Sequence, residues 1–295
     1  MIEKKVKNSI RDFWADRPMT YGIDHGKATF TKEDGSTITI SIGTPEFFEQ
    51  ADQVFYQWNA KWHNEESHFA KLFDFKAYKG KPVLEVGCGL GCMAMNWAQQ
   101  GATISAVDLN PVAIEQTTRR FSLFDLKGDI READGENLPF KNKRFDYAYS
   151  WGVLHHSPNT GKSISELYRV LKPGGKVGVM LYHRRSLWQR FFTEYIEGFI
   201  NMENKFLNQV ELASRYGDGY REEGNPHTWP VTKKEVYKEL FAQFTNVKIT
   251  VLGTELVAIF NQLLPNLGNK MPKALMDACI RRWGWSLWIT GEKAP

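Results

Sequence analysis

The segment that decides the fold runs from Lys81 to Gly91 and reads KPVLEVGCGLG. Its first half is a short apolar run bounded by a proline and a glycine, which is typical of a buried strand. Its second half leads into a helix expected to end near Gln100. Gly87 permits a tight turn, Gly89 lets the backbone approach a ligand, and Gly91 removes a side chain where helix meets strand. The segment therefore predicts a strand, a glycine loop and a helix whose N-terminus can face a ligand.

The residues after this loop continue the same alternation. A second buried strand, TISAVDL, ends near Asp108. Further strands are expected over 129–133, 145–151 and 176–183, and helices over 111–124 and 163–171. Strand–helix alternation over about 100 residues predicts an α/β fold, a parallel sheet with helices on both faces.

An acidic residue sits where such a sheet binds a ribose. Asp108 lies 21 residues after Gly87, at the end of the second strand, where a carboxylate can accept both hydroxyl protons of a ribose. The loop reads G-x-G-x-G, however, and Glu85 stands two residues before its first glycine. A carboxylate there would repel a pyrophosphate but hold a cationic ligand. A nicotinamide-dependent oxidoreductase is therefore a distant alternative, as is a glycine turn with a purely structural role.

Four regions follow from this pattern. Residues 1–80 are an N-terminal cap, in which we expect a helix, a β-hairpin over 28–42 and helices within 46–77. Residues 81–183 are the ligand-binding core, and 184–230 a helical insertion that caps the substrate. Residues 231–295 contain a helix over 232–244, a strand over 246–252, a largely helical stretch over 254–283 and a last strand over 284–292.

Composition excludes several classes of protein. The net charge is +4 and the basic pairs are scattered, so no nucleic-acid partner is expected. Three cysteines form neither a disulfide framework nor a convincing zinc site, and no metal site is predicted. The N-terminus has no apolar signal region and the chain has no long apolar run, so we expect a cytoplasmic protein without stable membrane insertion.

Aromatic residues are abundant, with 10 Trp, 11 Tyr and 19 Phe, and most lie outside 81–135. An aromatic stripe runs from Trp188 to Phe199 within the insertion. Packing against the sheet or the C-terminal helices is one interpretation of it. An apolar substrate pocket or a homodimer interface is a second. Interfacial membrane binding is a third, disfavoured because few basic residues flank the stripe.

Several segments together resemble the class I S-adenosylmethionine-dependent methyltransferases. VLEVGCGLG is similar to the first motif of the family and AVDLN to its second. The resemblance continues through EADGENLPFKNKRFDYAYSWGVLHH and ELYRVLKPGGKVGVMLYH. It implies a Rossmann-like sheet that is mostly parallel with its last strand antiparallel, and S-adenosylmethionine as the cofactor.

The resemblance also implies roles for individual residues. The loop glycines Gly87, Gly89 and Gly91 would line the methionine part of the cofactor, and Glu85 would help place its amino group. The remaining cofactor contacts would be Asp108 to the ribose, Leu109 beside the adenine, Asp134 to the adenine amine with Gly135 flanking it, and Ser150 with Trp151 near the sulfonium. Trp14, Arg17 and Tyr21 are candidates for a lid over the cofactor, or for packing in an N-terminal helix.

Catalytic candidates lie at the carboxyl ends of expected strands, where ligands bind in such sheets. His155 is the first candidate for a general base, ahead of His156, although either can instead orient a loop. Tyr182 and His183 end the fifth strand and are expected to line the substrate pocket.

These observations predict methyl transfer to the oxygen, nitrogen or carbon of a small molecule, because the caps confine the pocket and disfavour a macromolecular acceptor. Two alternatives stay open. The cofactor's own amine can attack its side chain, releasing methylthioadenosine, or the chain can bind S-adenosylmethionine without catalysis.

Overall fold

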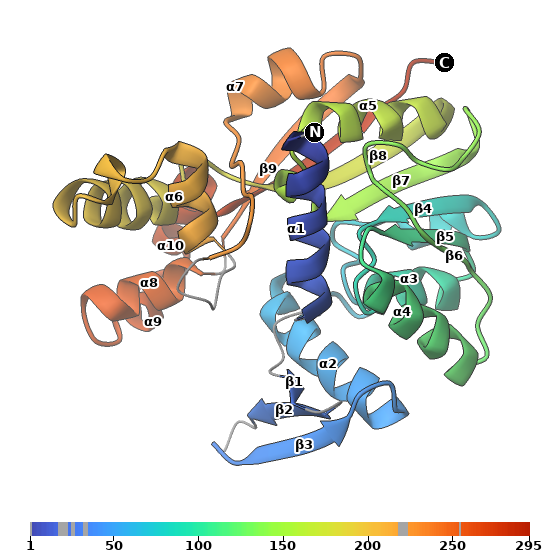
Figure 1. The fold of residues 1–295 in the computed structure, drawn as a ribbon, viewed down its shortest axis with the longest axis horizontal. Helices are drawn as coiled ribbons and strands as arrows, with labels where there is room; N and C mark the ends of the chain where they lie inside the picture. Colours follow the sequence, from blue (N-terminus) through green and yellow to red (C-terminus); the bar gives the residue numbers. More distant parts are fainter. Residues whose placement is uncertain (1, 17–22, 25–26, 32–34, 218–223, 254) are drawn as a thin grey trace.

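A seven-stranded sheet forms the centre of the molecule, in the order β6-β5-β4-β7-β8-β10-β9 (Figure 1). This computed structural model describes residues 2–16, 23–24, 27–31, 35–217, 224–253 and 255–295. The strands are β4 (Pro82–Val86), β5 (Thr103–Asp108), β6 (Asp129–Glu132), β7 (Phe145–Trp151), β8 (Leu171–Tyr182), β9 (Thr245–Leu252) and β10 (Ser286–Glu292). Strands β4 to β8 pair in parallel, whereas β10 runs antiparallel to both β8 and β9. The expected Rossmann-like sheet with an antiparallel last strand is confirmed.

Helices cover both faces because successive residues of the buried strands point to opposite sides. Val83 packs on one face with residues of α3 (Cys92–Gln99) and α4 (Pro111–Leu123). Leu84 packs on the other face with Ile164 and Leu167 of α5 (Thr160–Val170). The alternation read from the sequence is therefore correct for the core.

Some boundaries differ from those expected. Helix α5 begins at Thr160 because the Asn159 side chain accepts the backbone N–H of Lys162 as a cap. The expected helix over 232–244 is shorter, with α7 (Lys233–Glu235) running into η7 (Val236–Leu240). The helical stretch after 254 is divided by two prolines into α8 (Leu256–Leu263), α9 (Leu267–Lys270) and α10 (Lys273–Trp283).

The N-terminal cap contains α1 (Ile2–Asp16), a small sheet of β1 (Ile23–Asp24), β2 (Lys27–Thr31) and β3 (Thr37–Ser41), and α2 (Pro45–Trp58). The expected hairpin is confirmed by antiparallel pairing of Ala28 with Ile40. Two short helices follow, η2 (Ala60–Trp62) and η3 (Phe75–Tyr78). Buried aromatic rings of this region, including Phe73 and Phe75, pack against Trp97 beside the sheet. Much of the aromatic content of the cap therefore anchors it to the core.

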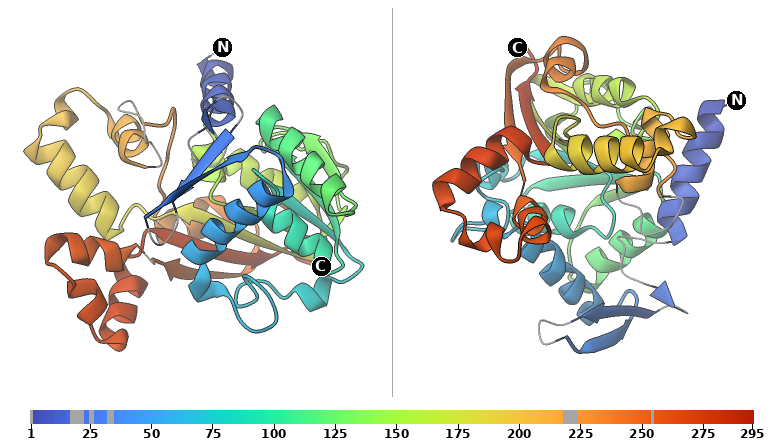
Figure 2. Two further views of the ribbon diagram at one scale, coloured as in Figure 1. Left: turned by 90° about the horizontal axis from the view of Figure 1, so that it is seen from below. Right: turned by 90° about the vertical axis from the view of Figure 1, so that its left-hand side faces the viewer.

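The insertion after β8 forms a helical lobe with the C-terminal helices, defined here as residues 184–216 and 255–283. It contains the π-helix η5 (Trp188–Ile200), η6 (Glu203–Lys205), α6 (Gln209–Tyr216) and α8 to α10. Leu187, Trp188 and Phe192 pack against a buried cluster of α8 and α10. The packing interpretation of the aromatic stripe is thus confirmed for its first part. Figure 2 shows the lobe projecting to one side of the sheet.

Among the described residues, no helix is long and apolar enough to cross a membrane.

Candidate functional site

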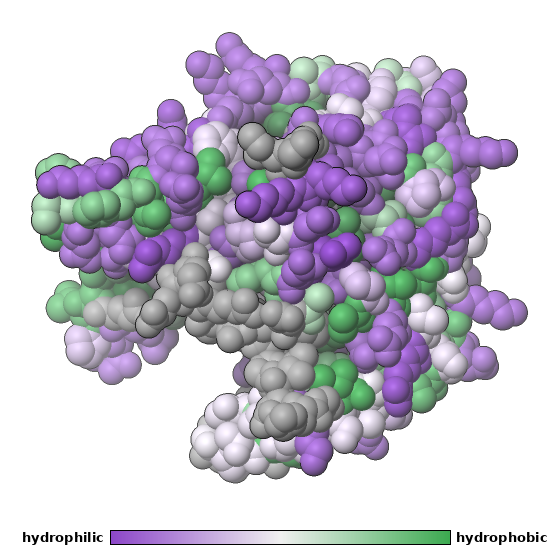
Figure 3. Space-filling view, in the orientation of Figure 1, coloured by the Kyte–Doolittle hydropathy of each residue, from purple (hydrophilic) through white to green (hydrophobic). Residues whose placement is uncertain are grey.

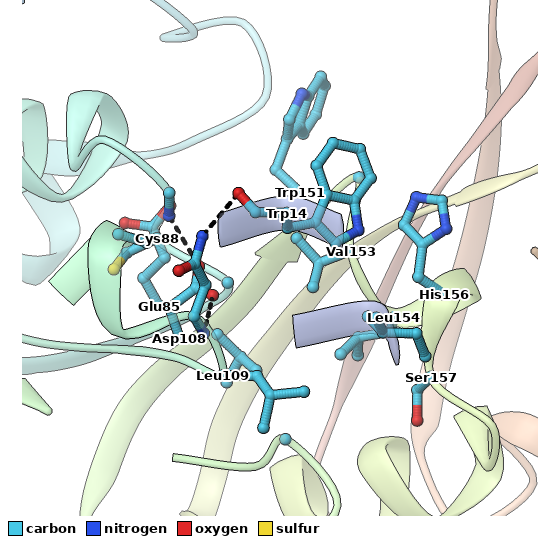
Figure 4. A pocket seen from close by; sticks show the side chains of 18 of the residues that line it. Trp14, Glu85, Cys88, Asp108, Leu109, Trp151, Val153, Leu154, His156 and Ser157 are labelled. Carbon is cyan, nitrogen blue, oxygen red and sulfur yellow. Dashed lines mark hydrogen bonds between the residues drawn. The ribbon is translucent and has the colours of Figure 1, made fainter. Parts of the chain in front are cut away.

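A predominantly apolar cavity of about 320 Å³ opens at the carboxyl ends of β4, β5 and β7 (Figure 4). Its walls come from the glycine loop, from the segments after β5 and β7, and from α1 and α2 of the N-terminal cap. Its volume falls in the range of small-molecule sites, roughly 300–1,000 Å³. The sequence-predicted residues that line it are Trp14, Glu85, Gly87, Gly89, Asp108, Leu109, Asp134, Gly135, Trp151, His156 and Tyr182.

The glycine loop depends on backbone conformations that other residues rarely adopt. Gly87, Gly89 and Gly91 all have positive φ, at 85°, 53° and 75°. A Cβ on Gly87 would lie 2.3 Å from a methyl of Val153, and one on Gly91 would lie 2.7 Å from Thr117 of α4. Gly87 therefore brings the loop against the segment after β7. Gly91 packs α3 against α4, and it does not itself line the cavity.

Asp108 fastens the loop to the end of β5. Its Oδ2 accepts the backbone N–H of Gly89 at 2.9 Å, and its Oδ1 accepts that of Asn110 at 2.9 Å. Burial raises the pKa of Asp108, although these two N–H groups act in the opposite direction. Each oxygen keeps capacity for a further donor, because a carboxylate oxygen has two lone pairs. The carboxylate is thus held in place by the backbone while its remaining acceptor sites face the cavity.

Glu85 is a buried carboxyl with an unsatisfied oxygen. Its side chain lies beneath the loop, and Oε2 has no hydrogen-bond partner in the described part of the chain. Burial raises its pKa to about 8, and the nearby Asp108 adds to the effect. The Tyr149 hydroxyl and the Ala94 backbone act in the opposite direction. A buried carboxyl with one unpaired oxygen in the wall of a cavity suits a cationic or hydrogen-bond-donating ligand.

An ionic contact closes the opposite end of the cavity. Lys7 of α1 donates to Asp134 Oδ2 at 2.7 Å and to Glu136 Oε2 at 2.6 Å. Burial alone would lower the pKa of Lys7, but the two carboxylates raise it overall. Glu136 is fully buried and also accepts the Ser157 hydroxyl at 2.5 Å. Lys7 therefore fixes helix α1 across the cavity, through two carboxylates that lie far away in the sequence.

Helix α1 also brings an aromatic ring into the site. Trp14 lies between the Glu85–Asp108 side of the cavity and His156 (Figure 4). Its carbonyl accepts the Asn110 side-chain amide at 2.9 Å, and its ring lies 5.4 Å from that of His156. Trp14 therefore occupies the place expected of a lid residue, whereas Arg17 and Tyr21 lie outside the described residues.

The catalytic candidates separate into one residue at the cavity and two behind it. Tyr182 lines the cavity. His155 is fully buried behind it, with ring centroids 3.7 Å apart, and neither ring nitrogen has a partner among the residues described. His183 is also buried, with Nδ1 3.1 Å from the Gly284 carbonyl. Burial lowers the pKa of His155 well below its ordinary value and that of His183 to about 4. Burial therefore favours the neutral form of both rings.

Two other predicted positions differ in their relation to the cavity. Ser150 is buried and donates to the Val86 carbonyl at 2.8 Å, so it supports the end of β4 without lining the cavity. His156, at the end of the 3₁₀-helix η4 (Leu154–His156), does line it. Its Nδ1 is 2.9 Å from the His227 carbonyl. Because a carbonyl only accepts, Nδ1 carries the proton and Nε2 is the basic nitrogen in the neutral ring.

Sequence reasoning also missed wall residues of α1 and α2, namely Lys7, Ile10, Arg11, Asp52, Phe55 and Trp58. Asp52 pairs with the fully buried Arg120 of α4, which ties α2 to the core. An amphipathic pattern in α1 and α2 was visible in the sequence, but it does not say which part of the core these helices cover.

The donor and acceptor set matches S-adenosylmethionine. The orphaned oxygen of Glu85 suits an ammonium group, Asp108 a ribose diol and Asp134 an exocyclic amine, while Leu109, Trp14 and Trp151 supply apolar and aromatic surfaces. Among the described residues, no group of three or more His, Cys, Asp or Glu side chains could hold a metal ion.

The comparisons with known proteins agree on one family. A family model described as a methyltransferase domain matches residues 84–179. A ubiquinone biosynthesis O-methyltransferase of Pseudomonas fluorescens is 31% identical over 176 residues, covering 52% of this chain and 75% of the relative. A protein of the same description from Pseudomonas entomophila is 33% identical over 132 residues, covering 40% of this chain and 56% of that protein. The chain thus spans only about half the length of this last relative.

Other relatives are more distant or match over shorter lengths. A sterol 4-C-methyltransferase of Caenorhabditis elegans is 36% identical over 95 residues, covering 32% of this chain and 28% of the relative. The crystal structure of geranyl diphosphate C-methyltransferase from Streptomyces coelicolor superimposes with a TM-score of 0.56 at 16% identity, covering 98% of both chains. This last likeness shows the fold. Sequence motifs, sheet topology and relatives agree that the chain belongs to the class I S-adenosylmethionine-dependent methyltransferases, with S-adenosylmethionine as its cofactor.

Proposed function

We propose that this protein transfers a methyl group from S-adenosylmethionine to a small, largely apolar molecule. The observation that carries the proposal is the cavity itself, which is covered by α1 and α2 and walled mainly by apolar and aromatic side chains. Such a confined space favours a small acceptor over a macromolecular one. The relatives named above methylate oxygen in one case and carbon in another, so the atom methylated follows from the acceptor rather than from the fold.

In this proposal the cofactor lies along the carboxyl ends of the strands. Glu85 and the glycine loop receive the methionine end, Asp108 the ribose, and Asp134 the adenine amine beside Leu109 and Gly135. Asp134 Oδ2 already accepts a hydrogen bond from Lys7. The adenine amine would therefore share this carboxylate with the side-chain ammonium group of Lys7. Lys7 is therefore part of the adenine end of the site.

The bound cofactor supplies a methyl group on a sulfonium, whose departure leaves a neutral thioether. The protein's part is therefore mainly to position the acceptor and to exclude water. Trp14 and Trp151 offer aromatic faces that attract a cation without acting as nucleophiles. Tyr182 faces the acceptor, with His155 as a positioning residue stacked behind it, and His156 offers a basic nitrogen for an acceptor that must lose a proton. His183 supports this end of β8 through its contact with Gly284.

The first prediction concerns the ribose carboxylate. Asp108→Asn keeps one acceptor oxygen but loses the charge, and we expect S-adenosylhomocysteine to bind about tenfold to a hundredfold more weakly in isothermal titration calorimetry. Asp129→Asn is the matched control, because Asp129 begins β6 away from the cavity and pairs with Arg131 and Arg144. Unchanged affinity of Asp108→Asn would refute the ribose assignment.

The second prediction concerns proton release at Glu85. With a pKa of about 8, the free carboxyl is mostly protonated at pH 7, whereas an ammonium ligand favours the ionised form. Binding of S-adenosylhomocysteine at pH 7 should therefore release a proton, and affinity should rise with pH until about pH 8. Calorimetry in two buffers of different ionisation enthalpy measures the release. Glu85→Gln should abolish it, and a release that persists in this variant rules out Glu85 as its source.

The third prediction concerns the contact that holds α1. Lys7→Met leaves two carboxylates without their shared cation, so we expect affinity for S-adenosylhomocysteine to fall about tenfold and amide exchange in α1 to accelerate. Lys4→Met, an exposed lysine of the same helix, is the control. If Lys7→Met matches the wild type in both measurements, α1 is held by its apolar face alone.

The fourth prediction tests the reaction. Purified protein is incubated with S-adenosylmethionine, first alone and then with a phenol, a sterol or an amine as acceptor, and nucleoside products are separated by chromatography. We expect S-adenosylhomocysteine only when an acceptor is present. Methylthioadenosine formed without an acceptor would establish the cyclisation alternative instead, and tight cofactor binding without any product would indicate a non-catalytic protein.

A further inference from the structure

The outer end of the helical lobe exposes a run of large apolar side chains. We define the distal patch as Tyr195, Phe199, Ile200, Met202 and Phe206, whose exposed fractions range from 49% to 83%. Figure 3 shows apolar residues at this edge of the molecule, over the outer end of η5. Monomeric soluble proteins rarely expose contiguous apolar surfaces of this kind unless they bind something there.

The helix that carries the patch buries several polar residues and leaves part of its apolar side exposed. Its buried residues are Gln189, Thr193 and Gly198, and buried oxygens of Gln189 and Thr193 have no hydrogen-bond partner among the described residues. On the outside, the rings of Phe191, Tyr195 and Phe199 stack in series, with centroids 5.9 Å apart at each step. A surface helix in water normally turns its apolar side inward. The outer side of η5 therefore suits an apolar or interfacial environment.

A second group of exposed apolar residues lies on the C-terminal part of the same lobe. Leu263, Leu264, Leu275 and Trp283 are 40% to 60% exposed. The buried cluster that joins η5 to α8 and α10 links the two groups. Both parts project from the same side of the sheet in the left view of Figure 2.

The charge of the lobe indicates which partner these groups suit. It has nine Lys and Arg against six Asp and Glu, so it holds +3 of the chain's net +4. Exposed basic residues stand beside the second apolar group, at Lys270, Lys273, Arg281 and Arg282, with the Arg282 guanidinium 5.8 Å from the centre of the Trp283 ring. The acidic residue of α10, Asp277, is paired with Lys61 of the N-terminal cap.

We propose that the helical lobe docks on the surface of a bilayer that contains anionic phospholipids. Aromatic and aliphatic side chains enter the boundary between headgroups and acyl chains, while Lys and Arg extend to the phosphates. A second copy docked symmetrically through the C-terminal group would bring the same exposed basic residues of α9 and α10 together, which disfavours a dimer there. Docking at the surface needs no membrane-spanning helix. It is also independent of the proposed reaction, since it concerns binding and not turnover.

A continuous series of aromatic contacts connects the docking surface to the cavity wall. Tyr182 contacts Trp285 at 4.6 Å between ring centroids, Trp285 contacts Trp188 at 6.4 Å, and Trp188 stacks on Phe192 at 5.3 Å. Phe192 contacts Phe191, where the exposed series begins. A chain of packed rings thus joins the surface that meets the bilayer to the wall that would hold an apolar acceptor.

Vesicle flotation tests the proposal with the whole chain. The protein is mixed with vesicles of phosphatidylcholine and phosphatidylglycerol, or of phosphatidylcholine alone, at low and high salt. We expect it to float with the anionic vesicles, less with the neutral ones, and less at high salt. The double variant Phe199→Ser, Phe206→Ser should float at least fivefold less, and Arg281→Gln, Arg282→Gln should reduce flotation only at low salt.

Tyr237→Ser is the matched control, because Tyr237 is 49% exposed on η7 outside the lobe. Calorimetry with S-adenosylhomocysteine shows that each variant retains its folded cofactor site. Absence of flotation with anionic vesicles, or equal flotation of the Phe199, Phe206 variant, would overturn the proposal. So would a dimer that sediments as such without lipid and dissociates in that variant, since the patch would then be an interface between two copies.

Discussion

The tie between the glycine loop and Asp108 is the constraint on which the site depends. Three glycines with positive φ let the chain leave β4, pass close to Val153 and Thr117, and enter α3 within five residues. The carboxylate of Asp108 then accepts a backbone N–H from this loop and another from the segment after β5. Two neighbouring parallel strands are thereby joined at their carboxyl ends, and the cavity opens beyond these ends and that of β7.

The N-terminal cap turns this open edge of a sheet into an enclosed site. Lys7 joins α1 to Asp134 and Glu136, and Asp52 joins α2 to Arg120. In both cases a basic side chain pairs with carboxylates that are far away in the sequence. These ion pairs are partly or wholly buried. Such pairs contribute more to the orientation of the helices than to the free energy of unfolding, because the cost of desolvating the charges offsets much of their attraction. Here they fix which helix faces the cavity.

The aromatic residues divide between two environments. Those of the N-terminal cap pack against Trp97 and the sheet, where they exclude water from one face of the core. Those of the insertion run from Trp188, packed against α10, outward to Phe199 and Phe206 at the surface. The sequence shows a single excess of aromatic residues, whereas the structure separates a packing role from an exposed one. The basic residues beside the second exposed group come from α9 and α10, about 70 to 90 residues after the stripe, so only the tertiary structure brings them into the same lobe.

Local sequence determined the core of this protein. Buried strands, glycines and the acid that ends β5 lie close together along the chain, so periodicity and spacing were enough to predict the sheet, the loop and the candidate positions Glu85 and Asp108. Asp134 was predicted only through the resemblance to the methyltransferase family. Which side chains reach the cavity was decided only by the tertiary structure. His155 and His156 are adjacent, but the 3₁₀ turn directs one into the core and the other to the cavity, and Lys7 meets its carboxylates across 127 and 129 residues. The physical reason is that such contacts depend on how separate elements pack against each other. The spacing of residues along one element does not determine this packing.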